Sequence, residues 1–290
     1  MGKNSSIEWT DHTFNPWWGC SKVSPGCEHC YAETWARRVG QDVWGSKQTR
    51  RFFTDKHWNE PLKWNDDAES AGERKRVFCA SMADVFEARR DLDEWRERLW
   101  LLIGKTPWLD WLLLTKRPQN IKAKVPWTND WPTNVWLGTT VEDQTRANER
   151  LPVLLQFPAA RRFLSCEPLI GPVDLDAWIK RPAKHLHPID WVIAGGESGA
   201  YSRPMLPGWA RKLRDQCRLA EIPFHFKQWG HWAPVATPKL EKPPAQKFWD
   251  EVSGKDIFME PKGKKIAGRR LDGATWDGIP MGIRHERISA

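Results

Sequence analysis

Short apolar runs alternate with stretches of helical periodicity from residue 77 onward. Between the runs, apolar residues recur with a helical period over residues 92–103, 143–155 and 209–220. Apolar strands that alternate with helices are typical of βαβ units and a parallel sheet. We therefore predict an α/β fold whose six strands cover residues 77–81, 111–115, 135–139, 162–165, 191–194 and 224–226.

The first 76 residues are less regular. Residues 7–10 read as one more short strand, and residues 33–39 have the composition of a helix that ends at Gly40. Residues 41–76 are polar and charged, and we interpret them as a surface insertion with a loop at 65–72. With the N-terminal strand, the chain has six or seven β/α units. This number is enough for a TIM-like barrel or an incomplete one over residues 1–232, and we expect the partial barrel.

Residues 233–290 differ in composition from the rest of the chain. They are rich in proline and glycine, and residues 262–270 form the basic run KGKKIAGRR. We interpret this part as a loosely structured, basic C-terminal extension. Its basic run is either a solvated face or a contact for phosphate groups, and the sequence leaves both alternatives open.

The composition restricts the partners and the compartment. No apolar run is long enough to cross a membrane, and the N-terminus has no secretory signal, so we expect a cytoplasmic protein. The net charge of +8 and the pI near 9.2 favour an anionic partner such as a nucleotide or nucleic acid. Of the 21 tryptophans, we expect most to lie in the core and a minority to stack on bases.

Three of the six cysteines, Cys20, Cys27 and Cys30, lie within eleven residues of one another. The Ser24-Pro25-Gly26 sequence predicts a turn that brings Cys20 back toward the other two. Three thiolates are one ligand short of a closed tetrahedral site, which suits a reactive metal centre. A [4Fe–4S] cluster with one open iron is one interpretation. Structural zinc completed by His29 or His12 is another, and a disulfide framework is disfavoured in a reducing compartment.

Ionisable residues follow nearly every predicted strand. Because the carboxyl ends of parallel strands meet at one edge, these side chains are expected to share a site. The alternative is an ion-pair network at the mouth of the barrel. The residues concerned are Asp84, Lys116, Arg117, Glu142, Glu167, Glu197 and Lys227.

Several motifs together resemble a known superfamily. A three-cysteine loop after the first strand of a β/α barrel resembles the cluster-binding loop of the radical S-adenosylmethionine (radical SAM) enzymes. The CxxCYA sequence at the end of this loop is similar to that of spore photoproduct lyase and its relatives. Over nearly the full length, the chain resembles the phage-associated gene-product-37/68 family. The motifs are FNPWWGCSKVSPGCEHCYAE, ASMADVFE, LLTKRP, WLGTTVED, FLSCEPLIGP, AGGESG, FKQWG and AGRRLDG. The first cysteine gap is three residues longer than the commonest radical SAM spacing.

The resemblance implies the roles of several residues. Cys20, Cys27 and Cys30 would bind a [4Fe–4S] cluster, and S-adenosylmethionine would bind the open iron. Electrons would come from a flavodoxin-type or ferredoxin-type donor. The strand ends would then supply cofactor-binding residues, namely Ser81, Met82, Asp84, Gly195, Gly196 and Glu197. Candidate catalytic residues in the same pocket are Lys116, Glu142, Glu167 and Lys227.

The predicted function is that of a radical SAM enzyme whose 5′-deoxyadenosyl radical abstracts hydrogen from a nucleotide or a modified DNA base. The reaction would be that of an isomerase, a lyase or a transferase. Two alternatives from other classes are a non-catalytic nucleic-acid-binding protein with structural zinc and a zinc hydrolase. The hydrolase would usually show paired histidine ligands such as HExxH, and the sequence has none.

Overall fold

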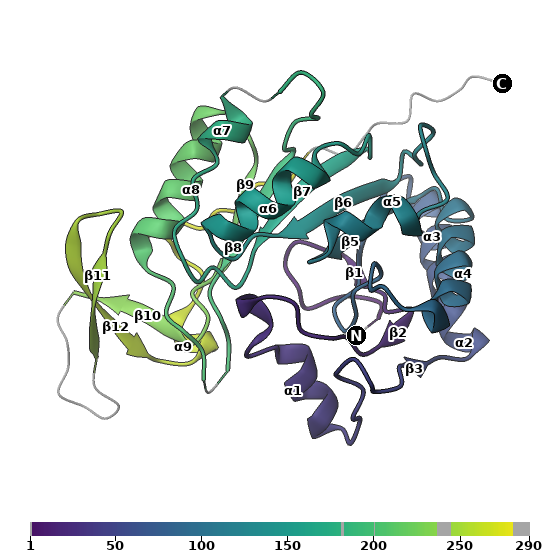
Figure 1. Ribbon diagram of the computed structural model, residues 1–290, viewed down its shortest axis with the longest axis horizontal. Helices are drawn as coiled ribbons and strands as arrows, with labels where there is room; N and C mark the ends of the chain where they lie inside the picture. Colours follow the sequence, from purple (N-terminus) through teal and green to yellow (C-terminus); the bar gives the residue numbers. More distant parts are fainter. Residues whose placement is uncertain (1, 181–182, 200, 237–244, 281–290) are drawn as a thin grey trace.

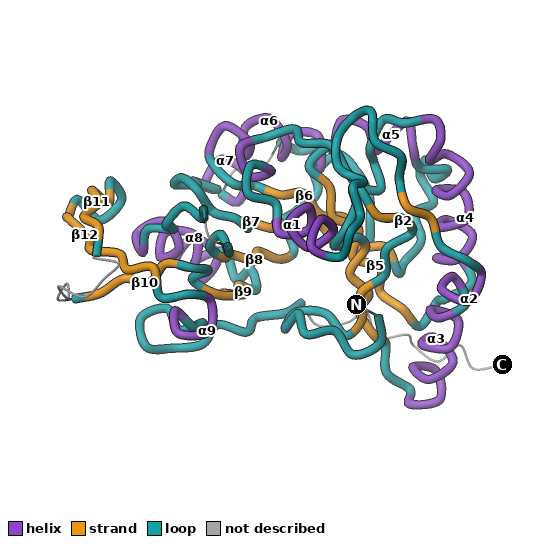
Figure 2. Tube along the Cα trace, turned by 90° about the horizontal axis from the view of Figure 1, so that it is seen from below, coloured by secondary structure: helices purple, strands orange, loops and turns teal. Residues whose placement is uncertain are grey.

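The computed structural model describes residues 2–180, 183–199, 201–236 and 245–280. Its centre is a parallel sheet of seven strands in the order β1-β4-β5-β6-β7-β8-β9. The sheet curls into a partial barrel, with helices on its outer side (Figures 1 and 2). The strands are β1 (His12–Thr13), β4 (Lys75–Cys79), β5 (Leu109–Thr115), β6 (Val135–Thr140), β7 (Arg161–Cys166), β8 (Trp191–Gly195) and β9 (Phe224–Gln228).

The predicted α/β partial barrel is confirmed, and so are its six regular strands. The strand predicted at residues 7–10 is wrong, because the amide of Thr10 donates to the carbonyl of Ile7 and closes a turn there. The strand lies instead at β1, where His12 pairs with Val77. The predicted helices are confirmed as α1 (Tyr31–Arg38), α4 (Asp93–Gly104), α6 (Gln144–Leu154) and α8 (Pro207–Leu219).

Alternation along the strands separates two apolar clusters. Inward-facing aromatic residues such as Trp136, Phe163 and Trp191 pack inside the barrel, whereas their strand neighbours pack outward against the helices. Gly138 leaves the space that the Phe163 ring occupies, because a Cβ there would overlap the ring. The outward-facing cluster also contains the three remaining cysteines, Cys79, Cys166 and Cys217, which are all buried.

The segment before β4 is more ordered than predicted. It contains β3 (Arg51–Phe52), paired with β2 (Trp17–Trp18), and the helices α2 (Asp55–Trp58) and α3 (Glu60–Ala71). The loop predicted at 65–72 is wrong, since α3 continues to Ala71 and ends at the left-handed Gly72. Trp58 and Trp64 are buried in the main core. The polar composition therefore reflects one solvated side of helices whose other side is part of the core.

The C-terminal part forms a second, antiparallel sheet. Its order is β10-β12-β11, with β10 (Trp232–Val235), β11 (Gln246–Asp250) and β12 (Lys255–Pro261), followed by α9 (Lys264–Ala267). The loose structure predicted from residue 233 onward is therefore wrong for these strands. The residues after α9 return to the barrel, where the carbonyl of Trp276 accepts from Phe226 and the amide of Gly278 donates to Phe224. They cover the open edge of β9.

The division at residue 232 stays a prediction. None of the helices in the described residues is long and apolar enough to cross a membrane.

Candidate functional site

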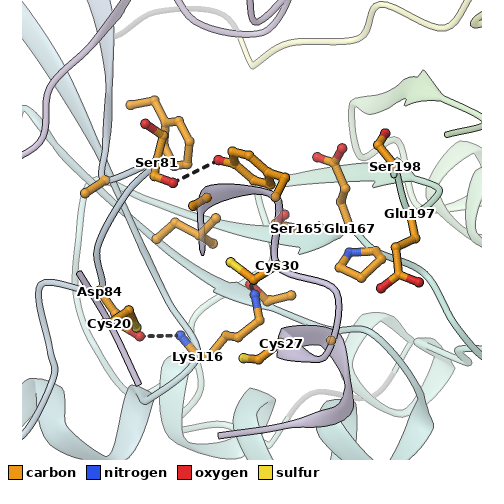
Figure 3. A pocket seen from close by; sticks show the side chains of 18 of the residues that line it. Cys20, Cys27, Cys30, Ser81, Asp84, Lys116, Ser165, Glu167, Glu197 and Ser198 are labelled. Atoms are coloured by element: carbon orange, nitrogen blue, oxygen red, sulfur yellow. Dashed lines mark hydrogen bonds between the residues drawn. The ribbon is translucent and has the colours of Figure 1, made fainter. Parts of the chain in front are cut away.

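A cavity of about 360 Å³ lies at the carboxyl ends of the parallel strands. All three clustered cysteines line it, together with side chains from the ends of β4 to β9 (Figure 3). This is the edge at which open and closed parallel sheets place their ligands. Most of the predicted site residues line the cavity, although they lie far apart in the sequence. They are Cys20, Cys27, Cys30, Ser81, Asp84, Lys116, Arg117, Glu167, Gly196, Glu197 and Lys227.

The cysteine loop is fixed to the end of β4 by its backbone. The amide of Gly19 donates to the carbonyl of Met82 at 2.9 Å. Gly19 has a φ of +115°, and a Cβ there would overlap the Val43 carbonyl, so only glycine fits. The predicted turn is present as a 3₁₀ helix at Pro25–Cys27. It brings Cys27 back to the same cavity as Cys20.

Two cationic side chains lie beside the cysteine sulfurs. Arg117 Nη1 is 3.6 Å from the Sγ of Cys20, and Nη2 donates to the carbonyl of Ser21 at 2.7 Å. Lys116 extends toward Cys30 and Cys27 (Figure 3), and its Nζ is 3.1 Å from the Oγ1 of Thr140. Positive charge is therefore concentrated where thiolate charge would develop on metal binding.

Burial controls the protonation of these thiols. It raises the pKa of Cys20 to about 12, although the nearby Arg117 partly offsets this effect. Burial also raises the pKa of Cys30, against the opposing effect of backbone amides and Lys116. Both thiols are therefore protonated at neutral pH, and a metal must displace their protons on binding.

Asp84 is saturated with hydrogen bonds from the protein. Its carboxylate accepts from Thr115 Oγ1 at 2.7 Å, Arg117 Nη1 at 2.8 Å, and the amides of Phe86 and Lys116, both at 3.0 Å. It thus holds the loop after β5 in place from a position on the cavity wall.

Ser81 and Met82 follow β4 but face different surroundings. Ser81 lines the cavity, and its carbonyl accepts a hydrogen bond from the Tyr31 hydroxyl at 2.9 Å. Met82 is fully buried and packs with Ala32 and Trp44 beneath the cysteine loop instead of facing the cavity. The predicted cofactor contacts of both residues stay predictions.

Acidic residues on the other side of the cavity are paired. Glu167 and Lys227 form an ion pair with 2.8 Å between Oε1 and Nζ. Glu197 is buried, and Arg203 contacts both of its carboxylate oxygens, the nearer at 2.6 Å. Arg203 also donates to the carbonyl of Pro25 at 2.9 Å and to Glu28 at 3.1 Å. This guanidinium therefore ties the loop after β8 to the cysteine loop.

Besides Met82, two predicted residues, Glu142 and Gly195, lie outside the cavity lining. Glu142 is fully buried under Gly26 and forms an ion pair with Arg150 at 2.7 Å. Burial alone would raise the pKa of Glu142, but the cations Lys116 and Arg150 outweigh burial and lower it. Gly195 packs against Glu167.

Gly196 lines the cavity, but close backbone packing also requires a glycine there. A Cβ at Gly196 would overlap the carbonyl oxygen of Trp229. Close backbone packing therefore explains the glycine at position 196, whatever else it contacts.

Some residues of the site have no clear signal in the sequence. Arg203 lies in a loop without periodicity, and Trp9 comes from a segment that we predicted as a strand. Lys264, from the C-terminal extension, also lines the cavity. The basic run in which it lies was the available signal, but nothing in the sequence places that run beside the barrel.

The three clustered thiols are compatible with a cluster as their ligand. In the described parts of the chain, no three His, Cys, Asp or Glu side chains are placed to share one metal ion. In a [4Fe–4S] cluster each cysteine binds a different iron, so the ligands need not converge on one point. Three thiols of one loop facing a common cavity, with Arg117 and Lys116 beside them, meet that requirement.

Comparisons with known proteins place the chain in a family. No curated protein matches it. A double mutant of spore photoproduct lyase with bound AdoMet and dinucleoside spore photoproduct aligns over 89% of this chain and 72% of its own, at 14% identity and a TM-score of 0.44. Spore photoproduct lyase complexed with dinucleoside spore photoproduct aligns over 89% and 70%, also at 14% identity and a TM-score of 0.44. The resemblance to the phage family stays a prediction. A family model described as "Protein of unknown function (DUF5131)" matches residues 4–280, and the chain therefore belongs to the DUF5131 family.

Proposed function

We propose that the chain is a radical SAM enzyme. The observation that carries this proposal is the position of Cys20, Cys27 and Cys30, which all line one cavity at the carboxyl edge of a parallel partial barrel. The same loop carries the sequence motifs that resemble the superfamily. A non-catalytic zinc protein would have no need for the ring of charged side chains around this cavity.

When bound, a [4Fe–4S] cluster and S-adenosylmethionine supply a 5′-deoxyadenosyl radical that takes a hydrogen atom from the substrate. The chain's own residues hold and shield these groups. Cys20, Cys27 and Cys30 bind the cluster, and Arg117 and Lys116 stabilise its negative charge. Trp9 and Phe78 line the cavity and exclude water from the reacting atoms.

The remaining residues divide between positioning and substrate contact. Asp84 and Glu197 act through the cations that they hold, Arg117 and Arg203. We assign cofactor contacts to Ser81 and Gly196, and substrate contacts or proton transfer to Lys116, Glu167 and Lys227. Met82, Gly195 and Glu142 lie behind the cavity lining, and we assign them a positioning role. We also propose a nucleotide or nucleic-acid base as the substrate, a flavodoxin-type or ferredoxin-type electron donor, and a cytoplasmic location.

Anaerobic purification with metal analysis tests the proposal. The purified protein should contain about four iron and four sulfide per chain, and addition of S-adenosylmethionine and a reductant should yield 5′-deoxyadenosine. Cys27→Ala should abolish cluster binding. Cys166→Ala is the matched control, because Cys166 lies at the same sheet edge but faces the helix side, and it should retain full iron content.

Two results would overturn the proposal. One is a stoichiometric zinc content with no iron after reconstitution, which would favour the zinc alternatives. The other is a full cluster in Cys27→Ala, which would show that other residues bind the iron.

A further inference from the structure

The β9 side of the cavity has a buried hydrogen-bond acceptor without a donor. Gln228 is 6% exposed and lines the cavity, yet its Oε1 has no hydrogen-bond partner among the residues that the structure describes. Its Nε2 donates to Glu167 Oε1 and to Ser198 Oγ, both at 3.3 Å. If the amide were flipped, its Oε1 would face the Glu167 carboxylate, and two acceptors would meet without a hydrogen atom between them. The contacts with Glu167 therefore fix the orientation of the amide. A buried unpaired acceptor is costly unless a ligand supplies a donor.

A donor of hydrogen bonds lies next to this acceptor. Lys227 precedes Gln228, lines the same cavity, and is 2.9 Å from Glu167 Oε2 and 2.8 Å from Oε1. An ammonium group has three hydrogen atoms, so at least one is left for a ligand. Gln228 and Lys227 together present one acceptor and one donor. They complement a heterocyclic base whose edge has an N–H group next to an acceptor atom.

An unpaired cation lies on the same wall. The backbone fixes residues 262–268 beside the turn after β9, because Trp229 donates to the carbonyl of Gly268 at 3.0 Å and Gly263 donates to that of His231 at 2.9 Å. α9 lies beside β10, the strand that follows β9. Lys264 lines the cavity from this segment and has no ion-pair partner within the described ranges. An unpaired ammonium next to a base-binding edge suits a phosphate group.

We propose that the β9 side of the cavity is a nucleotide-binding subsite, in which Gln228 and Lys227 bind the edge of the base and Lys264 binds the phosphate. The inference rests on the proposed function, since it takes this cavity to be the reaction site. A peptide amide also offers a donor and an acceptor. It has no phosphate for Lys264 to bind, however, and no ring to stack on the aromatic side chains of Trp9 and Phe78 in the lining.

Calorimetric titration of the anaerobically purified protein tests the subsite with two probes, thymidine and thymidine 5′-monophosphate. The monophosphate should bind more tightly than thymidine. Lys264→Ala should reduce this preference about fivefold at low salt and leave thymidine binding unchanged. Gln228→Met should weaken both probes about fivefold. Lys265→Ala is the matched control, because Lys265 is an exposed neighbour outside the lining, and it should change neither value by more than about twofold.

A third probe distinguishes a substrate base from the adenine of the cofactor. S-adenosylhomocysteine should bind to Gln228→Met as it does to the unchanged protein. If this variant loses affinity for S-adenosylhomocysteine and not for thymidine, the subsite belongs to the cofactor and the inference is overturned. Equal binding of the two thymidine probes, or an equal loss in Lys264→Ala and Lys265→Ala, also overturns it. Circular dichroism spectra confirm that each variant is folded.

The failures of the two proposals are separable. A protein that binds iron and cleaves S-adenosylmethionine, but in which neither Gln228 nor Lys264 affects the thymidine probes, retains the proposed function and loses this inference. A protein that contains only zinc but shows the expected nucleotide preferences loses the proposed function instead.

Discussion

Single buried charges near the cysteine loop are held by more than one partner. Arg117 is 5% exposed and contacts Cys20, the Ser21 carbonyl and the Asp84 carboxylate. Removing one member of a buried ion pair leaves the other charge without compensation. Arg117, which lowers the pKa of the Cys20 thiol, is therefore also important for the stability of the fold.

Arg117→Gln should lower the free energy of unfolding by about 2–4 kcal/mol. The reason is that Asp84 would lose the guanidinium with which it forms an ion pair and keep three neutral donors. Urea denaturation measures the change. Arg218→Gln is the control, because Arg218 pairs with Asp215 on the surface of α8 and both side chains are exposed, and it should shift the value by no more than about 0.5 kcal/mol. Equal losses in both variants would contradict the expectation.

His225 makes stability depend on pH. It is 1% exposed inside the barrel, where burial lowers its pKa from 6.5 to about 4; Arg269 acts in the same direction, and Asp277, Glu8 and Glu167 oppose it. Because the folded pKa is depressed, the unfolded state binds more protons between pH 6.5 and 4. The free energy of unfolding should therefore fall as the pH drops through this window.

The expected loss due to His225 is about 3 kcal/mol across this window. Denaturation midpoints of the unchanged protein and of His225→Phe, measured from pH 7.5 to 4, test it. The two profiles should run parallel above pH 6.5, and the variant should lose less stability below it. Profiles that stay parallel down to pH 4 would rule out this role of His225.

At the scale of elements, the loops after β8 and β9 touch through their backbones. Gly196 follows β8 and packs against the carbonyl of Trp229, and Gly230 follows β9 and packs against the carbonyl of Glu197. A Cβ on either glycine would overlap these main-chain atoms. This contact sets the width of the cavity on that side, because Glu197 and Gln228 flank it.

Gly196→Ala should destabilise the protein by more than about 2 kcal/mol, because neither backbone can move without breaking the sheet. Gly104→Ala, at the end of α4 with nothing within 4 Å of its Cβ, should be neutral or stabilise slightly. Urea denaturation of both variants gives the comparison. A Gly196→Ala protein as stable as Gly104→Ala would show that the loops adapt.

At the scale of the whole molecule, the C-terminal part is joined to the barrel. Met259 and Leu271 are fully buried in the same core as the sheet, and residues 274–278 cover the edge of β9. The two sheets share one core, so we expect them to unfold together.

Leu271→Ala should cost about 2–4 kcal/mol and shift the unfolding of the whole chain in a single transition. Leu219→Ala is the matched control, since Leu219 is 80% exposed, and it should change stability by no more than about 0.5 kcal/mol. Tryptophan fluorescence and circular dichroism should give the same midpoint. A separate early transition in Leu271→Ala would indicate that the C-terminal part unfolds independently.

The sequence by itself determined the six regular strands of the barrel and four of its helices, because apolar alternation and helical periodicity are local properties of the chain. It also determined the cysteine loop, since the spacing of Cys20, Cys27 and Cys30 and the turn at 24–26 depend on neighbouring residues alone. The ends of the six regular strands were predictable for the same reason, and so were the charges that follow them.

Only the tertiary structure decided which of those charges are free and which are occupied. Asp84 and Glu197 are saturated by Arg117 and Arg203, and Glu142 is buried beneath Gly26, because contacts between distant segments are set by packing and not by spacing. Packing also turned the polar segment 41–76 into part of the core and brought Lys264 to the cavity. These contacts join residues far apart in the sequence, so no local pattern encodes them.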